Sequence, residues 1–248
     1  MLCFGNRPTI VIHQFGRGPR APSLSPFVVK LETYMRMAKL EYTSEFGMKM
    51  SSKGKIPWMT CNGKVVADSQ LCIDFLNKEM GIDLSAHLTP EERAIARAFQ
   101  KMVEENSYWV MALTRFVFDN KEFLGKVVGL PKIFIWIAGI KIKTMSCGQG
   151  IGRHSYKELI DILEGDLRAL SVFLGDKRFL FGDRPCEADA AIFGQLSQFR
   201  WHNPGAPGEK FVTETFSNLR DYCERMKTMF WPDWDECITH DRTTKPSK

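Results

Sequence analysis

The sequence predicts a two-domain α+β protein, in which a small βαβ-ββα unit precedes a larger all-helical region. Two observations carry this prediction. Short β-rich segments and a hairpin signal are confined to the chain before residue 81, and capping boxes with long stretches of helical period occupy most of the remaining chain. The chain has 248 residues, which suffice for one large domain or two small ones with separate cores. We expect domains at 8–81 and 89–235, followed by a flexible tail at 236–248.

The first domain is expected to begin with a strand, a helix and a second strand. The segment "TIVIHQF" at 9–15 is β-rich and apolar nearly throughout, which is typical of a buried strand, and a loop rich in Gly, Pro and Arg follows it. Ser25 can cap a helix that has Pro26 at its first position, and apolar residues then recur at helical spacing. "EYTSEFG", at 41–47, reads as the second strand.

A hairpin and a second helix complete this domain. The strands "IPWMTC" and "KVVAD" flank Asn62-Gly63, which is the strongest short-range hairpin signal. A helix is then expected from Ser69 to Gly81, where glycine ends it.

Capping signals place the helices of the second domain. Thr89 and Glu92 form one capping box, and Ser155 and Glu158 form another. A third helix is expected after Pro185 and a fourth over 211–229. Cys186 and Asp189 stand where the third helix begins, and the thiol is a weak acceptor for its half of a capping box.

Composition and charge restrict the class of protein. The apolar fraction of 44% and the charged fraction of 25% are those of a globular chain. The net charge of +5 is mild, and no basic stripe or nucleic-acid motif is visible, so no nucleic-acid role is expected. Seven cysteines without a C-x-x-C spacing indicate a reducing compartment and no metal site.

No segment is an uninterrupted apolar span. The nearest is 123–143, which Lys126, Pro131 and Lys132 divide into pieces shorter than the roughly 18 residues needed to cross a bilayer. We expect a soluble cytoplasmic protein in which 123–143 is buried or in peripheral contact with a membrane.

Four motifs occur in order along the chain and together resemble the glutathione transferase superfamily. They are "SPFVVK" at 25–30, "SSKGKIP" at 51–57, "ADSQ" at 67–70 and "FLFGDRPCEADAAIFGQL" at 179–196. The resemblance covers about 8–235 and implies a thioredoxin-like first domain that binds glutathione as co-substrate. Within the superfamily, "GKIPWM", "DSQLCIDFL" and "WVMALTRF" are most similar to the failed-axon-connections branch, which is related to the metaxins.

The resemblance implies where glutathione would bind. A cis bond between Ile56 and Pro57 would turn backbone groups outward to pair with the cysteinyl part of the tripeptide, whereas an ordinary turn proline is the alternative. The helix start at Asp68 and Ser69 would receive the γ-glutamyl group, although Ser69 could simply be a helix cap. The remaining candidate contacts are Lys53, Lys55 and Gln70.

Ser25 is the candidate catalytic residue. Its position matches the redox cysteine of related proteins, and a hydroxyl there would stabilise the glutathione thiolate, which the helix N-terminus also favours. Serine cannot form the mixed disulfide that cysteine forms, so thiol reduction is disfavoured. An N-cap role is the alternative for Ser25, and Ser23 is a rival for the catalytic role. A pocket for an apolar electrophile would draw on Tyr108, Trp109, Phe116 and Trp201.

Three functions therefore remain open from the sequence. The first is glutathione transfer to a small apolar electrophile, with a homodimer as the superfamily default. A second is a non-catalytic interaction module of the metaxin type. The third is a different small-molecule enzyme on the same fold.

Overall fold

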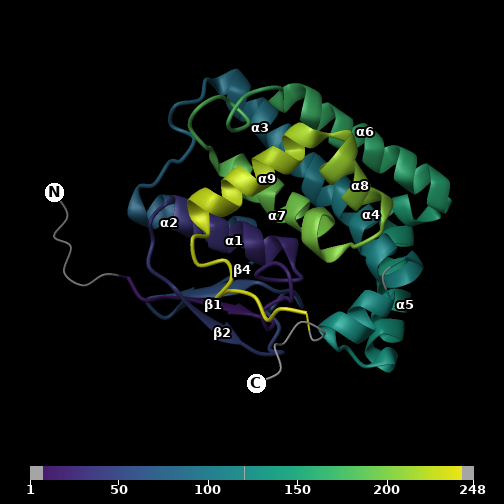
Figure 1. Cartoon of the computed structure of the whole chain (residues 1–248). Coiled ribbons are helices and arrows are strands. Elements are labelled where there is room, and N and C mark those ends of the chain that lie inside the picture. Colours follow the sequence, from purple (N-terminus) through teal and green to yellow (C-terminus); the bar gives the residue numbers. More distant parts are fainter. Residues whose placement is uncertain (1–7, 120, 242–248) are drawn as a thin grey trace.

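The computed structural model describes residues 8–119 and 121–241, and its arrangement confirms the predicted fold class (Figure 1). A four-stranded sheet lies at one side of the molecule. The helices α1 (Pro26–Met37) and α2 (Ser69–Met80) cover one of its faces. Most of the other long helices lie beyond α1, whereas α5 (Lys132–Gln149) lies to one side, level with the sheet.

The sheet has the strand order β2-β1-β3-β4. Its strands are β1 (Ile10–Gln14), β2 (Thr43–Phe46), β3 (Trp58–Cys61) and β4 (Lys64–Ala67). β1 and β2 are parallel, as a helical crossover requires, and the other neighbours are antiparallel. Opposite pairs such as Ile12 and Met59 are fully buried beneath the helices. The predicted β-α-β unit followed by a hairpin is thus confirmed.

Helices make up most of the second region, with both predicted capping boxes at their expected places. Thr89 Oγ1 accepts from the Glu92 N–H at 3.2 Å, and Ser155 Oγ accepts from the Glu158 N–H at 3.4 Å. Four segments are π-helical (η1, η2, η3 and η5) and one is 3₁₀ (η4), none of which was predicted. In chain order the elements are α3 (Pro90–Met102), η1 (Val103–Ser107), α4 (Tyr108–Leu113), η2 (Thr114–Phe118), η3 (Phe123–Val128), α5 (Lys132–Gln149), η4 (Ile151–Arg153), α6 (Tyr156–Leu174), α7 (Glu187–His202), α8 (Pro207–Lys210), η5 (Phe211–Thr215) and α9 (Ser217–Phe230).

The two regions meet where α1 packs against α7. A side chain at Gly194 would place its Cβ 2.5 Å from the Pro26 carbonyl oxygen and 3.1 Å from the Lys30 nitrogen. Only glycine therefore permits this approach of the helices. The start of α7 is held as expected, because the buried Asp189 carboxylate accepts from the backbone N–H groups of Cys186 and Leu180 at 2.8 and 3.0 Å.

Two predictions about the C-terminal region are wrong. The fourth helix is not continuous over 211–229, because Phe216 leaves the helical conformation (φ −114°, ψ 70°) to bury its ring. The tail is not flexible from residue 236, since Cys237 is buried and the Thr239 N–H donates to the Gly18 carbonyl at 2.9 Å. Asp241 also pairs with Arg20. Residues 242–248 of the predicted tail lie outside the described residues.

An ion pair fastens this returning segment to α1. Arg36 Nη1 and Nη2 lie 2.5 and 2.8 Å from the two carboxylate oxygens of Asp233, and the guanidinium stacks 3.9 Å from the centre of the Trp231 ring. Hydrogen bonding from Arg36 lowers the pKa of Asp233 from 3.8 to about 2.

We predict that Asp233→Asn lowers the free energy of unfolding near neutral pH, because the ion pair with Arg36 is lost. The loss should be only about 1 kcal/mol, because the pair is partly exposed to solvent. A carboxyl group whose pKa is lowered by folding stabilises the protein above its unfolded pKa, and the effect disappears as the pH falls toward the folded value. The difference between wild type and variant should therefore shrink between pH 4 and pH 2, the range set by these two pKa values. Urea unfolding of both proteins at a series of pH values measures this difference in the free energy of unfolding. Asp235→Asn, at an exposed neighbour, is the matched control, and an equal loss in both variants would contradict the assignment.

Candidate functional site

The register of the sheet brings three separate features of the sequence to one end of it. His13 is opposite Trp58, and Trp58 is opposite Ala67. Pro57 immediately precedes Trp58, and Asp68 immediately follows Ala67. Because β3 and β4 are antiparallel, both residues lie at the same end of the sheet, beside the end of β1. Because neighbouring strands lie about 4.8 Å apart, the start of β3 is flanked by the loop that leads to α1 and by the start of α2.

The bond between Ile56 and Pro57 is cis, as predicted. Pro57 is buried, and the turn before it is closed by hydrogen bonds from the Ser51 N–H to the Lys55 carbonyl at 3.1 Å and from the Gly54 N–H to the Ser51 carbonyl at 2.9 Å. Lys53 and Lys55 are exposed on this turn. Their charges are therefore available at the surface beside the cis bond.

Asp68, not Ser69, caps α2. The Asp68 carboxylate accepts from the backbone N–H groups of Gln70 and Leu71 at 2.9 and 3.3 Å. Ser69 is the first helical residue and is buried, so the alternative in which Ser69 is the cap is wrong. Asp68 has φ 93° and ψ 131°, a conformation that L-residues rarely adopt. Strain of this kind concentrates at ligand-binding sites.

Ser25 and Ser23 are in different environments. Ser25 occupies the N-cap position of α1, but its half-buried side chain makes no capping hydrogen bond. Ser23 is buried, and its hydroxyl oxygen accepts from the Ser25 N–H at 3.2 Å. The alternative in which Ser25 caps the helix through its side chain is therefore wrong in this structure, and the Ser25 hydroxyl is the less engaged of the two.

The loop before Ser25 is held by buried groups of the helical region that the sequence did not identify. Arg115 donates to the Leu24 carbonyl at 2.8 Å, to Asn203 Oδ1 at 3.0 Å and to Gln198 Oε1 at 3.1 Å. All three acceptors are neutral, and burial lowers the pKa of Arg115 to about 9. The only signal in the sequence was a charged residue within the mostly apolar "WVMALTRF".

Gln70 was predicted as a ligand contact, but its side-chain amide is hydrogen-bonded to other residues of the protein. Its Oε1 accepts from Lys30 Nζ and from Gln100 Nε2, both at 2.6 Å. Its Nε2 donates to Asp74 Oδ1 at 2.9 Å and to Glu187 Oε1 at 2.7 Å. These bonds use the full capacity of the amide, so Gln70 positions its neighbours in this structure instead of facing a ligand.

A buried ion pair accompanies Gln70. Lys30 Nζ lies 2.5 Å from Glu104 Oε1, and the two residues are 1% and 5% exposed. Lys30 lies in the second turn of α1 and Glu104 in the π-helical turn η1, so the pair connects the start of the first helix to the helical region. The sequence offered no sign that either charge is buried.

The four aromatic residues predicted to line a substrate pocket do not lie together. Tyr108 contacts Phe27 of α1 and its neighbour Trp109, with ring centroids 5.1 and 5.2 Å apart. Tyr108 thus packs on α1 two residues beyond Ser25, and Trp109 packs on Tyr108. Trp201 instead packs against Trp234, at 4.7 Å, and against Phe193, so the structure does not bring it to this pair.

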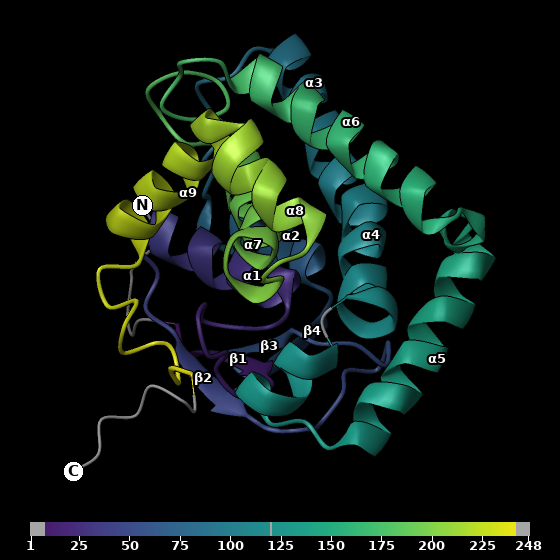
Figure 2. The same ribbon diagram turned by 45° about the vertical axis from the view of Figure 1, so that its right-hand side comes forward.

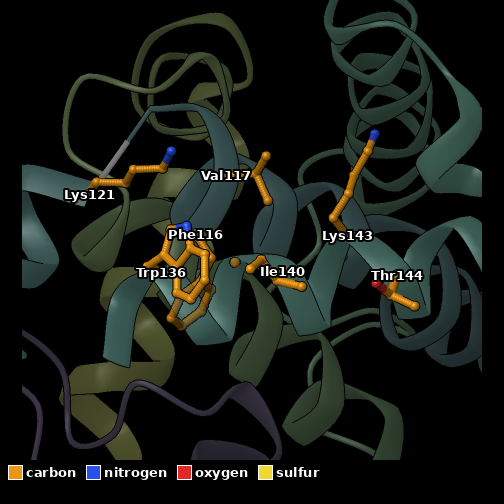
Figure 3. A pocket seen from close by; sticks show the side chains of 8 residues that line it. Phe116, Val117, Lys121, Trp136, Ile140, Lys143 and Thr144 are labelled. Carbon is orange, nitrogen blue, oxygen red and sulfur yellow. The ribbon is translucent and has the colours of Figure 1, made fainter. Parts of the chain in front are cut away.

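Phe116 lines a different cavity, of about 320 Å³, between η2 and α5 (Figure 3). The cavity is bounded by Phe116, Val117, Lys121, Trp136, Gly139, Ile140, Lys143 and Thr144.

Within the described ranges, the six cysteines are free and no cluster of His, Cys, Asp and Glu could hold a metal ion.

We predict that Lys30→Met lowers the free energy of unfolding by about 3 kcal/mol, because the buried Glu104 carboxylate loses its shortest ion-pair contact and keeps only the longer contact with Lys101. Lys30→Met/Glu104→Met should recover most of this loss, since both charges are then gone. Lys101→Met is the matched control, because Lys101 is partly exposed and lies 3.4 Å from the same carboxylate. Chemical unfolding of the wild type, Lys30→Met, Glu104→Met and the double variant measures the coupling, with Lys101→Met alongside. Additive losses would show that Lys30 and Glu104 do not stabilise each other.

Comparisons with known proteins agree with this architecture. The model of the glutathione S-transferase N-terminal domain matches residues 26–121, and that of the glutathione S-transferase C-terminal domain matches residues 163–226. Among solved structures, the β-etherase LigF from Sphingobium sp. strain SYK-6 superposes with a TM-score of 0.66 at 18% identity, covering 92% of this chain and 98% of that one. This likeness concerns the fold alone.

Curated relatives include proteins of different kinds. Failed axon connections of Drosophila melanogaster is 32% identical over 93% of this chain, which spans 60% of that relative's length. Isoprene-epoxide glutathione S-transferase of Rhodococcus sp. (strain AD45) is 28% identical over 84% of this chain and 94% of its own. Metaxin-2 of Mus musculus is 23% identical over 75% of this chain and 73% of its own. The chain belongs to the glutathione transferase superfamily, with failed axon connections and the metaxins among its relatives.

Proposed function

We propose that this protein is a glutathione-dependent transferase that activates the thiol of glutathione for attack on a small apolar electrophile. The observation that carries the proposal is the register of the sheet, which gathers the cis Ile56–Pro57 bond, the start of α2 at Asp68 and the loop leading to Ser25. A tripeptide extended along this end of the sheet would meet all three.

Each part of glutathione has a candidate partner. The backbone of Ile56 would pair with the cysteinyl part, as an added strand does. At α2, Asp68 occupies the N–H groups of Gln70 and Leu71, so a γ-glutamyl carboxylate would meet the N–H and the hydroxyl of Ser69. Asp68 would face the ligand ammonium.

The other end of the tripeptide would meet positive charge. Lys53 or Lys55 would accompany the glycyl carboxylate at the surface. Gln70 would act indirectly, by holding the start of α2 against α1 through Lys30.

Ser25 would supply the chemical assistance. Its hydroxyl would donate a hydrogen bond to the glutathione sulfur, which stabilises the thiolate over the thiol and raises the amount of nucleophile at neutral pH. The sulfur then forms a bond to the electrophilic carbon, the electron pair of the broken bond goes to the leaving atom, and the thiol proton passes to solvent. The pair Tyr108 and Trp109 would supply an apolar surface for the electrophile, and the relative that acts on an isoprene epoxide supports this substrate class.

A second candidate function is a non-catalytic interaction module in the cytoplasm. The filled hydrogen-bonding capacity of Gln70 favours it, because a predicted ligand contact is already satisfied internally. The relationship to failed axon connections and the metaxins is compatible with it. In this function the fold would serve homodimer formation, partner binding or peripheral membrane contact through 123–143.

We predict that the protein binds to immobilised glutathione and is eluted by free glutathione. Ser25→Ala should lower kcat/KM with an epoxide substrate by about 10- to 100-fold, because one hydrogen bond to the developing thiolate is lost. Its affinity for glutathione should change little. Ser217→Ala, at an exposed position, is the control. Passage of the wild-type protein through the column would favour the interaction module.

We also predict that Ser25→Cys forms a mixed disulfide when incubated with oxidised glutathione. The introduced thiolate would attack one sulfur of the disulfide, bond to it, and release the second glutathione as a thiolate. Intact-mass spectrometry detects the adduct. Ser217→Cys, exposed on α9, reports the rate of non-specific exchange. Equal rates for the two variants would contradict a glutathione site at Ser25, whatever the electrophile.

A further inference from the structure

Helix α5 presents an apolar face that no described residue covers. Ile133, Phe134, Trp136, Ile137 and Ile140 are each 50–63% exposed. They recur at the three- and four-residue spacing that places side chains on one side of a helix. We name these five residues the α5 face. Figure 2 shows α5 at the periphery of the molecule.

The inner side of α5 fixes the direction in which this face points. Ile135 and Ser146 are buried against the protein, and a Cβ at Gly139 would lie 2.9 Å from the Phe116 carbonyl oxygen. Glycine therefore allows α5 to lie directly on η2. The helix has 18 residues and is about 27 Å long, and no helix in the described part of the chain could cross a membrane.

The charge around the α5 face has one sign. The sequence from 123 to 157 contains no Asp or Glu, and its charged residues are cations. Lys132 and Lys141 are exposed on α5, and neither has an ion-pair partner among the described residues. Charged residues elsewhere in the chain are mixed, so this stretch is locally far more basic than the net charge of +5 suggests.

The cavity beside the α5 face repeats this combination. Phe116, Trp136 and Ile140 line it with apolar groups, while Lys121 and Lys143 stand at its edges (Figure 3). Lys121 is exposed, and Lys143 Nζ donates to the Gly152 carbonyl at 2.8 Å. An apolar base with cations at its margin suits an acyl chain whose phosphate stays in the headgroup layer.

We propose that the α5 face lies in the surface of a lipid bilayer that contains anionic lipids. Trp136 and the isoleucines enter the boundary between headgroups and acyl chains, and Lys132 and Lys141 contact lipid phosphates. A second copy of the chain fits this surface less well, because a two-fold contact between identical faces would bring these cations together without carboxylates. The inference goes beyond the transferase proposal and gives the membrane contact of the second candidate function a location and a lipid class. It holds whether or not glutathione is bound.

The test is sedimentation with vesicles of phosphatidylcholine alone and of phosphatidylcholine with about 30% phosphatidylserine. We expect at least about tenfold tighter binding to the anionic vesicles, and weaker binding as salt increases. Ile137→Asp should reduce binding by about tenfold or more, and so should Lys132→Glu/Lys141→Glu. The matched control is Val172→Asp on α6, where Val172 is 77% exposed, and it should bind as the wild type does.

Two measurements keep the outcome unambiguous. Circular dichroism and the unfolding midpoint must be unchanged in the variants, which is expected because the substituted residues are exposed. Trp136 is the exposed tryptophan among those described, so its emission should shift to shorter wavelength with vesicles and this shift should be absent in Trp136→Phe.

Three results would overturn the proposal. They are equal binding to neutral and anionic vesicles, unchanged binding of Ile137→Asp, or a dimer in light scattering that Ile137→Asp dissociates while vesicles are not bound. A failure of glutathione binding would leave the expected vesicle results as they are, so the two proposals fail separately.

Discussion

The burial of α1 on nearly all sides is the constraint on which the rest of the structure depends. The helix lies between the sheet and α7, yet it carries Lys30, Glu32 and Thr33 into the interior. A buried polar group without a hydrogen-bonding partner destabilises the folded state, so each of these side chains requires a partner from another segment of the chain. The three partners come from distant parts of the chain: Glu104 in η1, Arg17 in the loop after β1, and the Trp231 indole after α9. The start of α1, where Ser25 lies, is therefore positioned by both domains.

Features governed by local chemistry could be predicted from the sequence. The capping box at Thr89, the Asn62-Gly63 turn and the glycine that ends α2 act within a few residues, and all three occur as expected. The π-helical turns and the interruption at Phe216 could not be predicted, because long-range packing selects them over the regular helix. The order of residues 236–241 likewise depends on Arg20 and Gly18 at the other end of the chain.

The candidate site likewise has some features that depend on neighbouring residues and others that depend on distant contacts. The cis bond before Pro57 was expected from the family resemblance that a short motif carries, and the helix start after β4 was expected from the residues around Ser69. The internal partners of Gln70 and the buried cation of Arg115 depend on helices far away in the sequence. Trp109 and Trp201 are the same residue type and differ in the aromatic residues that surround them. Residue type alone could not separate an aromatic residue near the first domain from one in a distant cluster.

The α5 face and the candidate site are connected through η3. The Arg20 guanidinium lies 5.2 Å from the centre of the Phe123 ring, and that ring lies 6.1 Å from the His202 ring. His202 Nε2 in turn accepts from the Ala21 N–H at 3.1 Å. The segment before α5 thus packs on the loop that leads to Ser25, so a bilayer bound at α5 would hold the site in a defined orientation. Apolar electrophiles concentrate in lipid, and a transferase held there would meet its substrates where they accumulate.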